Sequence, residues 1–141
     1  MTIVGDGDYR YEVDYSWPKM PDWWEFGKAT DVAVDSKDRV WVYSRGLHPV
    51  TAWTADGDFI GSWGEGFFRQ PHGMYIDKED NLWLTEWQRH IVTKHSPSGE
   101  ILLELGVRDY AEVTVTPHGE HGLPFNSPTG VALYHFKSPS A

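Results

Sequence analysis

The chain has 141 residues, of which 40% are hydrophobic and 15% aromatic, so it can bury the core of one domain. Its net charge of −9 argues against binding to a nucleic-acid backbone, and its lack of cysteine excludes disulfides, thiolate zinc sites and cysteine nucleophiles. No apolar run has the length of a membrane span, and the first residues lack the features of a signal peptide. We therefore expect a soluble protein, cytoplasmic by default, without a nucleic-acid or membrane partner.

The first predicted element is a strand over residues 9–15. Tyrosine and valine at the odd positions alternate with charged side chains at the even positions, which is typical of a half-buried strand. A loop rich in aromatic rings follows over residues 17–24, and we expect it to pack over the first unit of the repeat described next.

The middle of the chain is an internal repeat. Residues 31–64 align without a gap on residues 73–106 after a shift of 42, the spacing from Asp35 to Asp77. Eight of these 34 positions are identical, where chance would give about two. Each unit reads as four short strands, in the first near residues 30–34, 39–43, 50–54 and 59–63, separated by turns rich in Asp and Gly. Four strands in about 40–45 residues is the size of a propeller blade.

Residues 127–133 parallel residues 70–76 at a larger offset, which places an insertion within residues 107–126. The predicted fold is therefore all-β: a partial, truncated β-propeller of four-stranded antiparallel blades, with two full blades and the first strand of a third. The expected divisions are residues 1–27 (strand and loop), 28–68 and 69–106 (blades), 107–126 (insertion) and 127–141 (start of the third blade and tail).

The shared apolar columns predict which side chains are buried. They indicate burial for Val32, Val34, Trp41, Ile76 and Trp83, and a place in the core between blades for Trp41, Trp53, Trp63 and Trp83. The aspartates of the turns, Asp35 and Asp38 with Asp77 and Asp80, are interpreted as turn formers and not as paired catalytic acids.

Five strings in order carry a resemblance to a known family: WPKMP, VAVDSKDRV, SRGLHPV, SWGEG and PHG. The units resemble NHL repeats. From about residue 9 to residue 133 the chain resembles bacterial proteins similar to peptidyl-α-hydroxyglycine α-amidating lyase. The resemblance implies a six-bladed propeller with zinc and calcium on its axis, and cleavage of a peptide ending in α-hydroxyglycine to a peptide amide and glyoxylate.

The resemblance also implies roles for four residues. His72 matches the first of three zinc histidines, and Arg45 matches an arginine that holds the substrate carboxylate. Val32 and Met74 match positions whose backbone carbonyls bind calcium. The other two zinc histidines and the catalytic tyrosine of the family have no counterpart here, whereas catalytic zinc needs about three protein ligands. We therefore expect an incomplete fragment without activity on its own, with no general base assigned.

Other polar and aromatic residues have structural interpretations. His48 and His90 share a repeat column, so both blades are expected to need the same packing or hydrogen bond. The string from His118 to His121 lies in the insertion and is interpreted as a flexible loop, although its spacing resembles that of a metal site. Trp87 stands where the first unit has Arg45, and it is a candidate for lining the mouth of the propeller.

Two functions follow from the sequence. The first is a lyase-like enzyme with a peptide substrate, zinc and calcium. The alternative is a non-catalytic NHL module or fragment that serves protein interaction or assembly, since fold does not fix function. A chain with two blades and one strand cannot close a ring by itself, so we expect a homo-oligomer in which further copies close the propeller.

Overall fold

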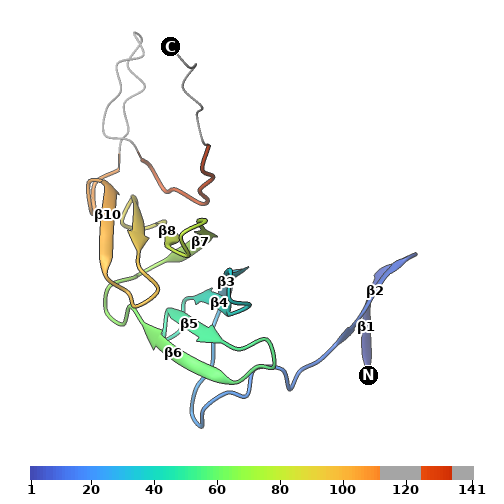
Figure 1. The fold of residues 1–141 in the computed structure, drawn as a ribbon. Coiled ribbons are helices and arrows are strands. Elements are labelled where there is room, and N and C mark those ends of the chain that lie inside the picture. The colour runs from blue at the N-terminus through green and yellow to red at the C-terminus, as the bar shows by residue number, and fades with distance from the viewer. Residues whose placement is uncertain (112–124, 135–141) are drawn as a thin grey trace, which may run out of the picture.

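The computed structural model describes residues 1–111 and 125–134, and within those residues the protein is all-β (Figure 1). Ten strands form one two-stranded sheet and two four-stranded sheets, and all pairings are antiparallel. This confirms the predicted fold class. None of the described residues belongs to a helix whose length and hydropathy would let it cross a membrane.

The two four-stranded sheets are the two blades of the repeat. The first blade consists of β3 (Ala29–Val34), β4 (Val40–Ser44), β5 (Val50–Trp53) and β6 (Phe59–Trp63). The second consists of β7 (Pro71–Ile76), β8 (Leu82–Glu86), β9 (Ile91–His95) and β10 (Ile101–Gly106). Each sheet is a simple meander, and β3 contacts β7, so the first strands of the two blades are neighbours (Figure 1).

Aspartate side chains build the first turn of each blade. Asp35 and Asp77 accept two backbone N–H groups of their own turn through Oδ1, and through Oδ2 the indole N–H of the tryptophan six residues later. Asp38 and Asp80 adopt φ angles of 58° and 63°, a left-handed conformation that aspartate tolerates. The turn-forming interpretation of these four residues is confirmed.

The core lies between the blades. It joins side chains of the first blade to side chains of the second around Phe68, in a cluster of Trp41, Tyr43, Val50, Ala52, Phe68, Met74, Leu82 and Leu84. Ile76 packs against the cluster, and Trp63 reaches across to Phe68 and His95. The predicted burial of Trp41 and the predicted contact of Trp63 between blades are confirmed.

Four of the five residues predicted to be buried are less buried than expected, and among them Ile76 is partly buried against the core cluster. Val32 and Val34 expose 59% and 57% of their surface. They occupy the columns of Met74 and Ile76, which pack against the preceding blade, but no described element lies on that side of β3. Trp83 is half-buried: the Lys94 ammonium lies over its ring as the Arg39 guanidinium lies over that of the buried Trp41, but only Trp41 belongs to the core cluster between the blades. Repeat columns therefore predict which face a side chain takes, and the neighbouring blade decides its burial.

Trp53 is fully buried but not between the blades, so its predicted location was wrong. It packs against Trp17, Phe26 and Phe59 on the side covered by the N-terminal loop. The Trp17 indole N–H donates to the Ala55 carbonyl. This confirms that the aromatic loop packs over the first blade.

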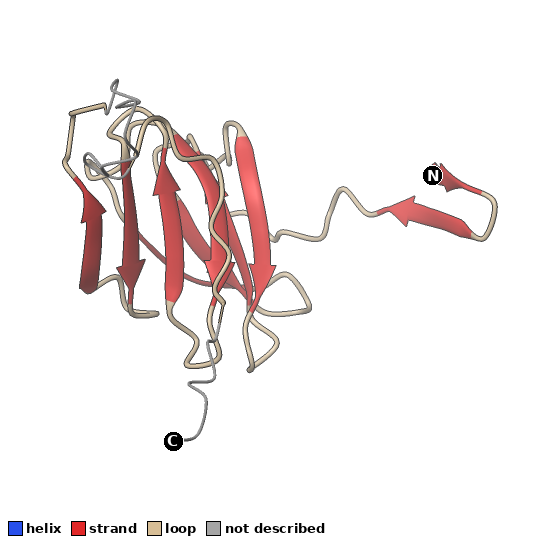
Figure 2. Cartoon of the chain, turned by 90° about the horizontal axis from the view of Figure 1, so that it is seen from above, coloured by secondary structure: helices blue, strands red, loops and turns tan. Residues whose placement is uncertain are grey.

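The N-terminal strand belongs to a hairpin that the sequence did not predict in full. β1 (Thr2–Asp6) pairs with β2 (Tyr9–Val13), and the hairpin extends away from both blades (Figures 1 and 2). Tyr9, Tyr11 and Tyr15 are exposed, so the expected half-buried strand was wrong: alternation was present, but no described element covers the apolar face.

The start of the third unit lies beside the second blade. The carbonyl of Thr129 is 3.0 Å from His72 Nδ1 on β7, the neighbour that an opening strand would have. Residues 125–134 form no strand in the described structure. The rest of the predicted insertion, including His118 and His121, and the predicted tail from residue 135 lie outside the described residues.

Candidate functional site

Arg45 is held at the end of β4 by two backbone contacts. Its N–H donates to the Lys28 carbonyl at 2.9 Å, and its Nε donates to the Pro71 carbonyl at 3.0 Å. The side chain is half-buried, and within the described residues no carboxylate pairs with it. Because guanidinium is always charged, this arginine is fixed in place with its charge uncompensated by the described residues.

His72 lies on β7, directly after the residue whose carbonyl holds Arg45. Its Nδ1 is 3.0 Å from the Thr129 carbonyl, which can only accept, so Nδ1 carries a hydrogen, and in the neutral ring Nε2 then carries the lone pair. A second hydrogen bond of this kind fixes the tautomer of histidines that bind metals. The structure thus brings the two predicted site residues together through Pro71, although they are far apart in the sequence.

The predicted calcium residues lie on the neighbouring strands β3 and β7. Asp31 links them, because its carboxylate accepts the N–H of Val32 at 2.9 Å and the N–H of Met74 at 2.7 Å. Met74 is buried and Val32 is exposed. Their roles as carbonyl ligands stay predictions.

The described residues do not complete a metal site. Among them no group of three or more His, Asp or Glu side chains is placed to hold a metal ion. His72 alone does not satisfy the needs of catalytic zinc. The described residues therefore offer one candidate zinc ligand, His72.

His48 and His90 make structural contacts, but different ones. The ring of His48 stacks on Trp24 at 3.4 Å between centroids, and its Nδ1 is 2.9 Å from Glu65 Oε1. His90 has a φ of 58°, and its Nδ1 accepts the N–H of Ser127. The expectation that both blades need the same contact at this column was therefore wrong.

A hollow of about 580 Å³ opens beside Arg45. It lies between the loop before β3 and the loop after β4, and it is lined by Trp23, Trp24, Glu25, Gly27, Arg45, Gly46, Leu47 and His48. Glu25 makes no ion pair with Arg45 among the described residues. The two loops cross backbone to backbone: a Cβ on Gly46 would lie 2.7 Å from the Phe26 carbonyl oxygen. Trp87, the counterpart of Arg45 in the second blade, is partly exposed and does not line this hollow.

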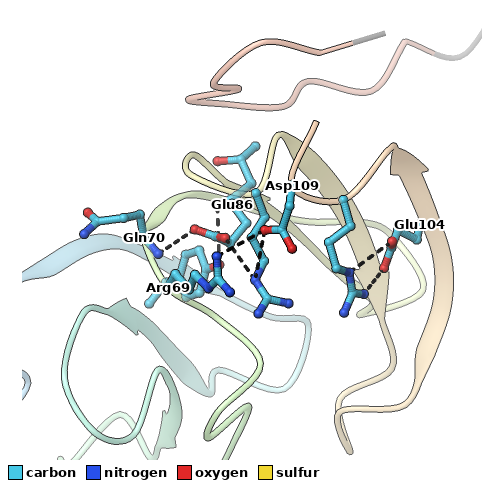
Figure 3. Close-up of polar contacts among 9 residues, drawn as sticks. Arg69, Gln70, Glu86, Glu104 and Asp109 are labelled. Carbon is cyan, nitrogen blue, oxygen red and sulfur yellow. Dashed lines mark hydrogen bonds and ion pairs between the residues drawn. The ribbon is translucent and has the colours of Figure 1, made fainter. Parts of the chain in front are cut away.

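The second blade buries charged groups at the equivalent place, which the sequence interpretation missed. Glu86 is fully buried and accepts the N–H of Gln70 through Oε1, and it lies between Gln70 and Asp109 (Figure 3). Its Oε2 and the Nε of Arg89 lie 3.9 Å apart, and neither has a hydrogen-bond partner among the described residues. Asp109 is also 3.9 Å from Arg89 and pairs with Arg69 at 3.3 Å.

The sequence did hold a signal for this network. Where the second unit has Glu86 and Arg89, the first has Ser44 and Leu47, so two opposite charges appear together three residues apart, at the end of a strand and in the loop after it. A paired change of this kind indicates an ion pair that a single column does not reveal. Burial and, next, the charge of Glu86 raise the pKa of the neighbouring Tyr43 well above its usual value.

Known proteins resemble this chain in part. No family model matches it. Over 45 residues it is 47% identical to "Peptidyl-alpha-hydroxyglycine alpha-amidating lyase 1" of Drosophila melanogaster, covering 32% of this chain and 8% of that protein. It is 31% identical to "Peptidylglycine alpha-amidating monooxygenase" of Rattus norvegicus, covering 69% of this chain and 13% of that protein. It is 29% identical to "NHL repeat-containing protein 3" of Homo sapiens, covering 84% of this chain and 35% of that protein.

The chain thus spans between 8% and 35% of the length of these three curated relatives. Together with the four-stranded blades, these similarities confirm the resemblance to NHL-repeat propellers and to the amidating-lyase family.

Proposed function

We propose that this chain forms the part of a lyase-type NHL propeller that binds the carboxylate end of a peptide, in the release of a peptide amide and glyoxylate from peptidyl-α-hydroxyglycine. The observation that carries the proposal is Arg45, a half-buried cation anchored through Nε and without a carboxylate partner among the described residues. The names of two relatives, an amidating lyase and an amidating monooxygenase, support the same chemistry.

The geometry of Arg45 suits a terminal carboxylate. The Pro71 carbonyl occupies Nε, so both terminal nitrogens of the guanidinium remain to donate two parallel hydrogen bonds. Partial burial strengthens such a pair relative to one in open water. Arg45 therefore binds and orients the ligand. In the cleavage itself the hydroxyl proton leaves as the C=O bond of glyoxylate forms, the C–N bond breaks, and the amide nitrogen gains a proton.

The other predicted site residues have narrower roles in this proposal. His72 offers Nε2 as one ligand for a zinc ion, and the carbonyls of Val32 and Met74 are the candidate calcium ligands. Because the described residues do not complete a zinc site, no step is assigned to a metal and no described residue is assigned as the base. Turnover on this proposal requires groups beyond the described residues.

Calorimetric titration of the chain with a peptide bearing a free C-terminal carboxylate, and with the same peptide as its C-terminal amide, tests this proposal. We expect binding of the carboxylate form, loss of that binding in Arg45→Met, and partial retention in Arg45→Lys, since lysine keeps the charge but not the planar fork. Equal binding of both peptides would contradict the proposal. We expect the 141-residue chain to release no glyoxylate from a peptide that ends in α-hydroxyglycine. If the unaltered chain released glyoxylate and His72→Ala abolished that release, the proposal would also be contradicted.

A second function, assembly, is favoured by the exposed apolar faces at the two ends of the described blades. Val32 and Val34 are exposed on β3, although their counterparts in the second blade pack against the first. At the other end Leu105 on β10, in the column of Trp63, is partly exposed. We propose that a second copy of the chain packs against these faces, in the way that the two blades of one chain pack against each other.

Light scattering at micromolar concentration tests the assembly. We expect a dimer or larger species that dissociates in Val34→Glu, because a charge would then be buried in the new contact. Tyr9→Glu, in the projecting hairpin, is the control and should leave the assembly intact. A folded, strictly monomeric chain would contradict the proposal.

A further inference from the structure

Trp23 is the most exposed large side chain beside Arg45. Its exposed fraction is 99%, and Leu47 across the hollow is 85% exposed. Single exposed apolar residues are ordinary on protein surfaces, but here two of them flank one half-buried cation at one hollow. That combination calls for a ligand with an anionic group and an apolar group close together.

The backbone of Trp23 has an unfavourable conformation, and in this conformation the ring is exposed to solvent. The N–H of Trp24 donates to the Pro21 carbonyl, which makes Trp23 the third residue of a tight turn, and its φ is +70°. That position favours glycine, and a bulky residue there costs about 1 kcal/mol or more. Strain of this kind that brings the ring no packing in the protein is a reason to look for a binding role.

The hollow itself is a built feature. The loop before β3 crosses the loop after β4 at Gly27 and Gly46, where the backbones approach too closely for a side chain. On one wall the Trp24 ring stacks on His48, which in turn pairs with Glu65. The loops that carry Trp23 and Arg45 are thereby fixed relative to one another.

We propose that Trp23 and Leu47 form an apolar subsite for the side chain that precedes the terminal residue held by Arg45. The preferred ligand is then a peptide end with a free carboxylate and a large apolar penultimate residue. This inference rests on the proposed carboxylate binding, and it adds a preference for the residue that precedes the terminal residue of the peptide. Arg45 provides the affinity for the charge, and the Trp23 ring provides contact area that stays unused in the free protein.

The test compares three probes by calorimetry on the full chain: acetyl-Phe-Gly, acetyl-Ala-Gly and acetyl-Phe-Gly-amide. We expect acetyl-Phe-Gly to bind about tenfold more tightly than acetyl-Ala-Gly, a typical preference for an apolar pocket. In Trp23→Gly the preference should shrink to about twofold or less while carboxylate is still preferred over amide. Glycine suits the positive φ, so this variant should fold at least as well as the unaltered chain.

Trp87→Ala is the matched control, because it removes a partly exposed tryptophan from the equivalent loop outside the hollow. It should leave the preference for acetyl-Phe-Gly unchanged. An undiminished preference in Trp23→Gly, or an equal loss in Trp87→Ala, overturns the subsite. Carboxylate binding without any preference for the phenylalanine peptide overturns the subsite alone, whereas equal binding of the carboxylate and the amide overturns the proposed function as well.

Discussion

The two blades share their scaffold, and three of the columns in which they differ are informative. Strands, turn aspartates and the tryptophan bonded to each aspartate repeat almost unchanged. The end of the second strand and the first residue after it are instead Ser44 and Arg45 in the first blade, and the buried Glu86 and the partly exposed Trp87 in the second. In the third column Trp53 corresponds to His95.

The difference separates what holds a blade together from what a blade does. In the first blade Ser44 accepts and donates hydrogen bonds within its own loop, which leaves Arg45 as the one charged side chain of residues 44–47. In the second blade the equivalent loop uses its charges to hold Gln70 and to face Arg89. We infer that the first loop serves binding and the second serves structure.

The largest difference in stability is expected between the two repeated tryptophans. Trp41→Ala should lower the free energy of unfolding by about 3–5 kcal/mol, because its ring is buried in the core between blades. Trp83→Ala should cost about 2 kcal/mol, because that ring is half-buried. Urea unfolding followed by circular dichroism measures both. Equal losses would show that Trp83 is covered as fully as Trp41 in solution.

The next effect concerns the buried pair of the second blade. Arg89→Leu introduces the residue of the first blade and leaves the Glu86 carboxylate buried without its cation, so we expect a loss of about 3 kcal/mol. The double variant Glu86→Ser with Arg89→Leu copies the first blade at the two positions of the pair and should recover at least half of that loss. A double variant as unstable as Arg89→Leu would mean that the pair itself stabilises the fold.

A smaller effect is expected from His95, which stands where the first blade has Trp53. The rings make the same contact, Trp53 Nε1 to Thr51 Oγ1 at 2.8 Å and His95 Nε2 to Thr93 Oγ1 at 2.9 Å, but only histidine titrates. Burial lowers the pKa of His95, against the smaller opposing effects of the Gly99 carbonyl and the Glu104 charge. The folded protein therefore binds this proton less well than the unfolded chain.

It follows that His95 supports stability fully above about pH 6.5, the usual pKa of histidine, and that this support is lost as the pH falls below it. Thermal unfolding between pH 7.5 and 4.5 should show the decline, and His95→Phe should remove it. His90→Asn keeps a residue that tolerates the positive φ of that position and is the control. The lowered pKa values of Asp35 and Asp77 affect stability only at still lower pH. A decline that persists in His95→Phe would contradict the assignment.

Much of the fold could be predicted from the sequence, because a period of 42 residues with matching apolar columns is enough to predict where the strands lie. The exposure of Val32 and the location of Trp53 could not, since they depend on which element covers a face. Arg45 and His72 were named through a family resemblance, and the structure adds that Pro71 joins them. The hollow and the Glu86 network depend on loop crossings and paired columns, which a strand-by-strand interpretation does not see.

One exchange between the blades tests the division of roles most directly: Arg45→Trp, which gives the first loop the residue of the second. Thermal unfolding and titration with acetyl-Phe-Gly are measured on the same sample. We predict a fall in the unfolding midpoint that is clearly smaller than that of Arg89→Leu, because Arg45 loses its hydrogen bond to the Pro71 carbonyl but no ion pair among the described residues, together with loss of carboxylate binding. Retained binding, or a fall in midpoint as large as that of Arg89→Leu, would contradict the account.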